Sequence, residues 1–173
     1  MATKTTFKFN GKAFGKAIYN RIAEEQTARL IAYAEEELVR IVESKKFDDR
    51  TYNLSDSYFW CVFFQGKRKG FGTYGRKKAS KNSLLHEYTP MISVKVNGRA
   101  LANEFGKSYE PQERQGWEIV FGAVAPYGAY LEEGFMFHGK RYQFDVMSQR
   151  YDHIKNALSP LCKVTLEIHT PKY

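Results

Sequence analysis

The sequence predicts an α+β fold in which a long N-terminal helix packs on a mostly antiparallel β-sheet, with a short helix and a second helix near the C-terminus. Two observations support this fold. Residues 12–44 place apolar side chains three and four positions apart, as on one face of a helix. Residues 57–66, 116–124 and 162–169 are short and rich in β-branched or aromatic side chains, as strands are. With 173 residues and 43% hydrophobic content, the chain is expected to form one domain over residues 1–173.

The N-terminal helix is expected to begin after Asn10, which is a good N-cap residue. Glutamates and arginines fill most positions between the apolar ones, so one face should pack on the sheet and the other should meet water. The apolar face is predicted to consist of Phe14, Ile18, Ile22, Leu30, Ile31, Ala34, Leu38, Ile41 and Val42.

The first strand is expected in the segment SYFWCVFFQG, residues 57–66, because aromatic residues and valine favour extended backbone. The polar segment before it contains Asn53 and Asp56, which are turn or cap formers. MISVKVNG, residues 91–98, alternates in polarity and ends in Asn-Gly, which predicts a strand that enters a turn.

The second half of the chain predicts two helices. Residues 99–109 are either a short helix or an irregular connection. Pro126 at a first helical position and Gly134 as a stop predict a short helix between them. Residues 145–160 predict the second helix, which should end before Pro160 because the residue preceding a proline disfavours the helical region.

The net charge of +8 favours an anionic partner. No zinc-protease, hydrolase or P-loop motif occurs, so we expect no catalytic, cofactor-binding or metal-binding residues and no enzyme activity. Cys61 and Cys162 lie in apolar runs and are expected to be buried thiols. The first twelve residues lack an apolar stretch and no run is long enough to cross a bilayer, so we expect neither a secretion signal nor membrane contact, and synthesis in a cytoplasm.

Residues 66–82 are predicted to form a basic, glycine-rich arm. Gly70, Gly72 and Gly75 fit G-x-G-x-x-G, but no strand ends directly at the first glycine and no helical pattern follows the third, as a dinucleotide site requires. We expect this arm to contact a partner protein first and DNA second; a solvated charge run is the remaining interpretation. Its contact residues are predicted to be Lys67, Arg68, Lys69, Phe71, Tyr74, Arg76, Lys77, Lys78 and Lys81.

Two stretches, FDDRTYNLSDSYFW and FGAVAPYGAYLEEGF, together resemble the tail-completion, or head–tail joining (neck), proteins of tailed bacteriophages. Members of that family have a long N-terminal helix and then a Thr-Gly-x-Leu-x-x-Ser segment that enters a strand. Thr51, Leu54 and Ser57 match this segment, although Tyr52 stands where the family has glycine.

The second family segment is Tyr-Ala-x-x-x-Glu-x-Gly, followed by a region rich in aromatic residues and a C-terminal helix. Tyr127, Glu132 and Gly134 match it, with Gly128 in place of the alanine. The short helix predicted here would present tyrosines, which are enriched at protein interfaces. Its assembly interface is predicted to consist of Tyr127, Tyr130, Leu131, Glu132 and Glu133.

The resemblance implies a virion structural protein of the neck, which forms a homo-oligomeric ring between the portal or head-completion proteins and the tail proteins and helps to seal the DNA channel. The alternative is a small basic nucleic-acid-binding protein that contacts phosphates through residues 67–81. A third class, a metal-dependent nuclease, would have to use Glu132, Glu133 and Asp152.

Overall fold

A computed structural model describes residues 10–44, 53–74, 97–125, 135–137, 139–142 and 147–168. Its main sheet has four strands in the order β2-β1-β3-β6, and a separate two-stranded sheet pairs β4 with β5. In chain order the elements are α1 (Gly11–Glu43), α2 (Asn53–Asp56), β1 (Tyr58–Phe64), β2 (Lys67–Thr73), α3 (Gly98–Ser108), β3 (Trp117–Ala123), β4 (Phe135–Phe137), β5 (Lys140–Tyr142), α5 (Ser148–Leu158) and β6 (Lys163–Ile168).

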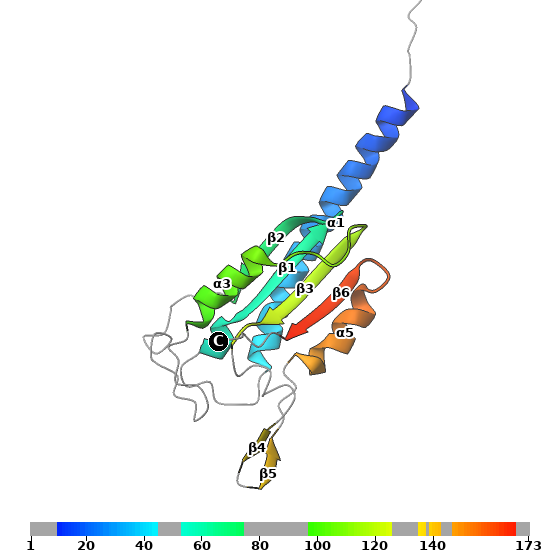
Figure 1. Cartoon of the computed structure of the whole chain (residues 1–173). Coiled ribbons are helices and arrows are strands. Elements are labelled where there is room, and N and C mark those ends of the chain that lie inside the picture. Colours follow the sequence, from blue (N-terminus) through cyan, green and yellow to red (C-terminus); the bar gives the residue numbers. More distant parts are fainter. Residues whose placement is uncertain are drawn as a thin grey trace, which may run out of the picture.

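The predicted α+β class with a mostly antiparallel sheet is confirmed. β1 pairs antiparallel with both β2 and β3, whereas β6 runs parallel to β3. A parallel pair needs a crossover connection, and α5 lies directly before β6 in that connection (Figure 1). Among the described residues no helix is long and apolar enough to span a membrane.

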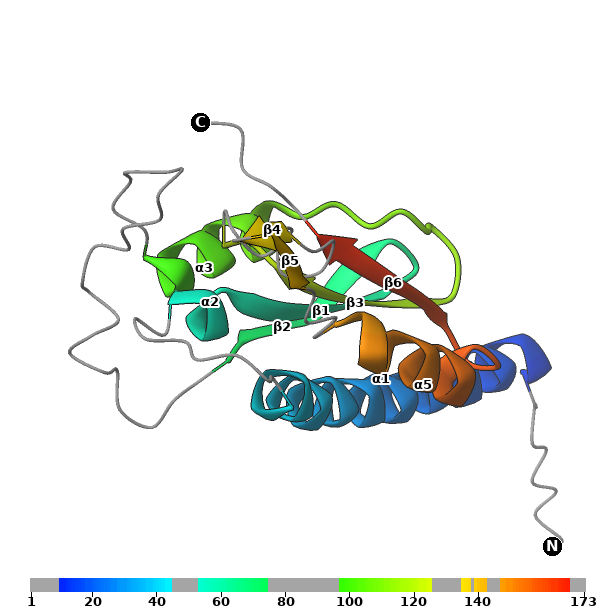
Figure 2. The same cartoon turned by 90° about the horizontal axis from the view of Figure 1, so that it is seen from below.

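Helices cover both faces of the main sheet. Figure 2 shows α1 and α5 on one side and α3 on the other. Successive side chains of a strand point to opposite faces, so Trp60 and Val62 of β1 join the core under α1, while Phe59 and Cys61 join the core under α3. This burial on both faces explains why β1 is an almost continuous apolar run.

A buried ion pair fixes α1 against α5. Glu37 of α1 is fully buried, and its carboxylate accepts hydrogen bonds from both the Nε (2.7 Å) and the Nη2 of Arg150. Arg40 donates a further hydrogen bond to the same carboxylate. Burial and the nearby Glu37 charge raise the pKa of Tyr33, which lies beside this pair. The ion pair therefore joins the two helices that cover one face of the sheet.

The helix starts follow local capping rules. Asn10 caps α1 as predicted, accepting a hydrogen bond from the backbone N–H of Ala13. Asn97 caps α3 in the same way through Ala100, so the prediction of a strand-ending turn at Asn97-Gly98 is wrong. Residues 91–96, where that strand was expected, lie outside the described residues. Residues 99–109 are helical almost throughout, since α3 ends at Ser108.

The prediction of a basic, glycine-rich arm is wrong for residues 67–73, which form strand β2. β1 and β2 are joined by a tight turn at Gln65 and Gly66, which both have positive φ, as a two-residue hairpin turn requires. The ladder shifts register after Val62, where β2 holds an extra residue, Lys69, in a β-bulge. Charge patterning suggested a loop because the strand begins with three basic residues.

Candidate assembly interface

The N-terminal part of α1 extends beyond the sheet (Figure 1). The helix is 33 residues long, which corresponds to about 50 Å. Its first residue that is buried on folding is Ala23, and burial recurs from there to Val42. We call Gly11–Ile22 the projecting segment, because all of its residues are exposed.

Large apolar side chains occupy one side of the projecting segment. The exposed fractions of Phe14, Ile18 and Ile22 are 55%, 44% and 52%. These residues are four positions apart, so they form one stripe along the helix. The prediction that they belong to the core face is wrong. An exposed apolar stripe of this kind is typical of a protein–protein contact.

The direction of this stripe explains its exposure. At about 100° per residue, the stripe is centred about 160° around the helix from the buried positions that include Leu30, Ala34 and Leu38. One continuous helix cannot turn both faces toward the same sheet. The angular offset between the two groups of positions can be calculated from the sequence. Grouping the apolar positions by three- and four-residue steps did not reveal it, because a stripe with a four-residue step rotates by about 40° at each step.

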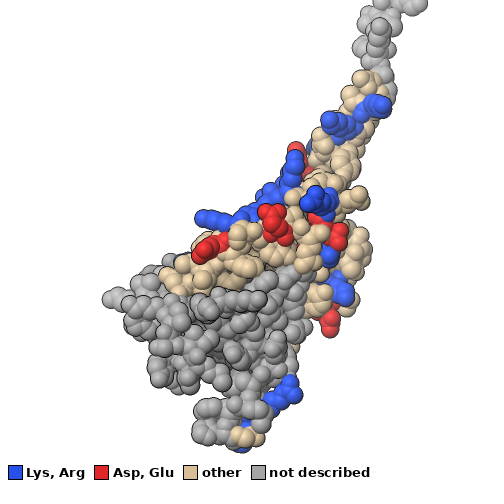
Figure 3. All heavy atoms as spheres, in the orientation of Figure 1, with Lys and Arg blue, Asp and Glu red and all other residues tan. Residues whose placement is uncertain are grey.

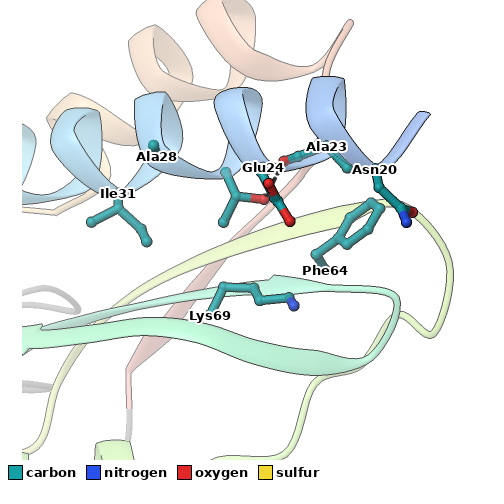
Figure 4. A pocket seen from close by; sticks show the side chains of 8 residues that line it. Asn20, Ala23, Glu24, Ala28, Ile31, Phe64 and Lys69 are labelled. Atoms are coloured by element: carbon teal, nitrogen blue, oxygen red, sulfur yellow. Dashed lines mark hydrogen bonds between the residues drawn. The ribbon is translucent and has the colours of Figure 1, made fainter. Parts of the chain in front are cut away.

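Tyr19 fixes the base of the projecting segment to the sheet. Its ring lies 6.4 Å from that of Phe64 at the end of β1, and its hydroxyl accepts a hydrogen bond from the Gln65 side chain at 3.2 Å. Next to it, a pocket of about 350 Å³ lies between α1 and β2 (Figure 4). Glu24 from the helix and Lys69 from the strand face this pocket, above an apolar floor that includes Phe64.

A second and more open recess, of about 630 Å³, lies where β3 and β6 begin. Trp117, Tyr151 and Leu161 supply its apolar lining, and Leu161 is 56% exposed. Lys163 forms an ion pair with Glu113 at 2.9 Å across its rim. Both recesses are lined by mixed apolar and charged groups, as protein contact surfaces are.

The predicted contact residues of the basic arm have different roles in the structure. Lys67 and Lys69 are exposed on β2. Arg68 is exposed too, but its guanidinium donates hydrogen bonds to the carbonyls of Lys107 and Tyr109, both at 2.8 Å. It thereby binds the carboxyl end of α3, where a cation is favoured by the helix dipole. Arg76, Lys77, Lys78 and Lys81 lie outside the described residues.

The two aromatic residues of the predicted arm are half-buried and pack against the two cores. Phe71 packs against the core under α3, and Tyr74 packs against the core under α1. The glycines between them make room for other rings: a Cβ on Gly72 would lie 2.6 Å from the Trp60 indole nitrogen. Gly70 and Gly72 are therefore packing glycines of a strand, not hinges of an arm.

The first of the two family-like segments has a structural role here. Leu54 is buried, and Ser57 donates its hydroxyl hydrogen to the Leu54 carbonyl at 2.7 Å, closing the turn that enters β1. Thr51 lies outside the described residues, as does the whole predicted interface. That predicted interface comprises Tyr127, Tyr130, Leu131, Glu132 and Glu133, so its placement stays a prediction.

Comparisons with known proteins found no match among protein-family models, curated proteins or solved structures. In the part of the chain that the structure describes, no group of three or more His, Cys, Asp or Glu side chains is placed to hold a metal ion. We therefore infer the function from the surfaces described above and from the resemblance in the sequence.

Proposed function

We propose that this chain is a structural protein of a virion, located at the head–tail junction, where it forms a ring that connects the portal side to the tail and helps to seal the DNA channel. The observation that carries the proposal is the projecting segment of α1, which exposes an apolar stripe to solvent. In a protein that works by assembly, such a stripe is covered by a neighbour.

The arrangement of the chain supports the same proposal. A long N-terminal helix, a serine-closed turn into a central strand and a helix near the C-terminus occur in the order that the resemblance implies. The projecting helix reaches well beyond the globular body (Figure 1), so it is suited to contact a neighbour in a ring. Portal or head-completion proteins and tail proteins are the proposed partners on the two sides of that ring.

Direct nucleic-acid binding has less support as the primary function. Phe71 and Tyr74, two of the predicted contact residues of the arm, pack against the two cores instead, and Arg68 binds α3. Lys67 and Lys69 remain as exposed cations in the described part of the predicted arm. DNA in the channel is therefore a secondary contact in our proposal.

The experiment is a joining assay in the virus that encodes the chain. Particles produced without this protein should accumulate as DNA-filled heads and separate tails in electron micrographs. Adding the purified chain should restore joined particles, and a tag on the chain should capture a particle that contains a fixed multiple of copies. Normal particles in its absence, or a small captured complex whose mass is lost with nuclease, would contradict the proposal.

A further inference from the structure

Two lysines of the projecting segment lie on the side of α1 that is opposite to the apolar stripe. At about 100° per residue, Lys12 and Lys16 point within about 40° of the centre of the buried side of the helix. They therefore continue the sheet-facing side of α1 beyond the end of the sheet. Both are exposed, and about 6 Å along the helix axis separates them.

Two lysines of β2 lie where the helix leaves the sheet. Lys67 follows the β1–β2 turn directly and is paired with Phe64 in the ladder, so both side chains lie on the face that α1 covers. Lys69 lies on the same face, because it lines the pocket between α1 and β2 (Figure 4). The hydrogen bond from Gln65 to Tyr19 holds this end of the hairpin against the base of the projecting segment.

Arg114, in the loop before β3, adds a fifth cation beside the same turn. A Cβ on Gly66 would lie 3.6 Å from the Arg114 Cα, so the loop packs against the β1–β2 turn. The Arg114 side chain is exposed. Cations thus lie on the projecting helix and on the end of the sheet from which it extends. We call this group the basic corner; it consists of Lys12, Lys16, Lys67, Lys69 and Arg114.

The charges of the basic corner are not neutralised within the described part of the chain. No described acid forms an ion pair with any of its members, whereas two arginines elsewhere on α1 pair with glutamates one turn away. Glu24 faces the same pocket as Lys69, yet no ion pair joins these two described side chains. Figure 3 shows blue side chains at the outer end of the helix and both colours where the helix meets the body. Lys12 and Lys16 repel each other across one helical turn, so a bound anion would stabilise this surface.

The composition of the basic corner favours a nucleic acid over an acidic protein as this anion. Four of its five members are lysines, which are depleted in protein–protein interfaces relative to the rest of the surface. A row of lysines suits the successive phosphates of a nucleic-acid strand. Tyr19 lies between the lysines of the helix and those of β2, and its exposed fraction is 52%. Proteins that bind single strands combine cations with exposed aromatic rings, because bases stack on the rings.

We infer that the basic corner binds the phosphate backbone of a single-stranded nucleic acid and that the Tyr19 ring stacks on one of its bases. Lys12 and Lys16 contact phosphates along the helix, and the other three cations contact phosphates at the end of the sheet. This contact is separate from the joining of heads to tails, so the inference goes beyond the proposed function and does not rest on it.

The test is fluorescence anisotropy of a labelled oligothymidylate with the purified full-length chain, over a range of salt concentrations. The five cations should contribute about −3.5 to the slope of log K against log salt, because each contact with a single strand contributes about −0.7. Lys12→Ala with Lys16→Ala should weaken binding at low salt by about tenfold and make the slope shallower by about 1.4.

Arg29→Ala with Lys140→Ala is the matched control, because it removes the same charge from exposed positions outside the basic corner. Arg29 lies on the side of α1 that faces away from the sheet. Lys140 lies in the β4–β5 hairpin, at the opposite end of the body from the projecting segment (Figure 1). This control should keep the slope of the wild type.

Substitution of Tyr19 tests the stacking contact. Tyr19→Leu should weaken binding of the oligothymidylate at least about fivefold and leave the salt slope unchanged, because base stacking is not ionic. Tyr19→Phe loses the hydrogen bond with Gln65 but keeps the ring, so it should bind as the wild type does. A duplex of the same length should bind more weakly, since its bases are already stacked. Circular dichroism of each variant checks that the fold is retained.

Four results would overturn the inference. These are binding that does not respond to salt, a control variant as weak as the Lys12 and Lys16 variant, full binding by Tyr19→Leu, and polyglutamate that competes as well as unlabelled oligothymidylate does. None of these measurements needs the virus. A chain that joins heads to tails but binds no oligonucleotide would therefore overturn the inference and leave the proposed function intact.

Discussion

At the scale of single residues, the structure assigns packing roles to glycines that look like a phosphate-binding motif. Gly70 makes room for Ile31 and Trp60, Gly72 makes room for the Trp60 indole, and Gly106 on α3 makes room for the ring of Phe71. A strand that lies close under two helices requires such gaps, because each added Cβ would overlap a ring. The first two glycines of the G-x-G-x-x-G pattern are therefore explained by the close packing of β2.

Gly106→Ala should destabilise the protein by about 1–3 kcal/mol, because the new methyl group overlaps Phe71 and the surrounding core cannot move freely. Gly15→Ala is the matched control: it is also a helix glycine, but its Cβ would meet nothing within 4 Å. Urea unfolding of both variants gives the free energies of unfolding. Equal effects of the two substitutions would show that Phe71 does not pack against α3.

The ion pair of Glu37 predicts a second residue-scale effect. Glu37→Gln should lower the free energy of unfolding by about 3 kcal/mol, because it leaves Arg150 half-buried without its counter-charge. Glu36→Gln breaks an exposed pair with Arg40 and should cost less than about 1 kcal/mol. Denaturant unfolding at neutral pH compares the two. A Glu37 variant as mild as the Glu36 variant would mean that α5 is not joined to α1 through this pair.

At the scale of elements, periodicity predicts most of the fold. The range of α1, with Asn10 as its cap, and strands β1 and β3 follow from local pattern, since burial imposes it directly. β2 could not be predicted this way: its three basic residues face water or bind α3, and its glycines are explained only by the Trp60 ring of β1 and the Ile31 side chain of α1. Such contacts arise from distant parts of the chain, so local patterning does not contain them.

The exposed apolar stripe illustrates a different limit. Phe14 and Ile18 are apolar at helical spacing, like Leu38 and Ile41, and spacing alone does not say how far the sheet extends beneath the helix. The angular offset of the stripe from the buried positions of α1 was the feature of the sequence that could have shown its exposure. For the projecting segment, the sequence therefore predicted an apolar stripe at helical spacing but assigned that stripe to the core.

Arg68 tests whether β2 is a strand held against α3 or a free arm. Arg68→Ala should lower the free energy of unfolding by about 1–2 kcal/mol, since two hydrogen bonds to the carboxyl end of α3 are lost. Arg68→Lys should recover only part of this, because one ammonium does not reproduce the planar fork. Lys67→Ala, on the same strand, should stay within about 0.5 kcal/mol of wild type. A free arm would make all three substitutions neutral.

At the scale of the whole molecule, two separate cores hold the sheet, and each contains one thiol. Cys61 lies in the core under α3, whereas Cys162 lies in the core under α1 and α5. Burial raises the pKa of Cys61 to about 12 and that of Cys162 to about 11. Because only the thiolate is nucleophilic, both side chains should resist thiol reagents at neutral pH until the protein opens.

These thiols make stability fall at high pH. A thiol in the unfolded chain ionises near pH 9, and in the folded protein it stays protonated to about pH 11 or 12. Their stabilising effect is therefore complete below about pH 9 and declines as the pH rises toward the folded values, by up to about 1.4 kcal/mol per pH unit for each thiol. Other groups ionise in the same range, so the informative quantity is a difference between variants.

The measurement is urea unfolding at about pH 8 and about pH 10 of wild type and of Cys61→Ala, Cys162→Ala and the double variant. Wild type should lose the most stability between the two pH values, each single variant less, and the double variant the least. Because the thiols lie on opposite faces of the sheet, equal contributions mean that both cores open in one transition. If removing Cys61 leaves the pH dependence unchanged, the core under α3 opens before the rest, and the protein unfolds one face at a time.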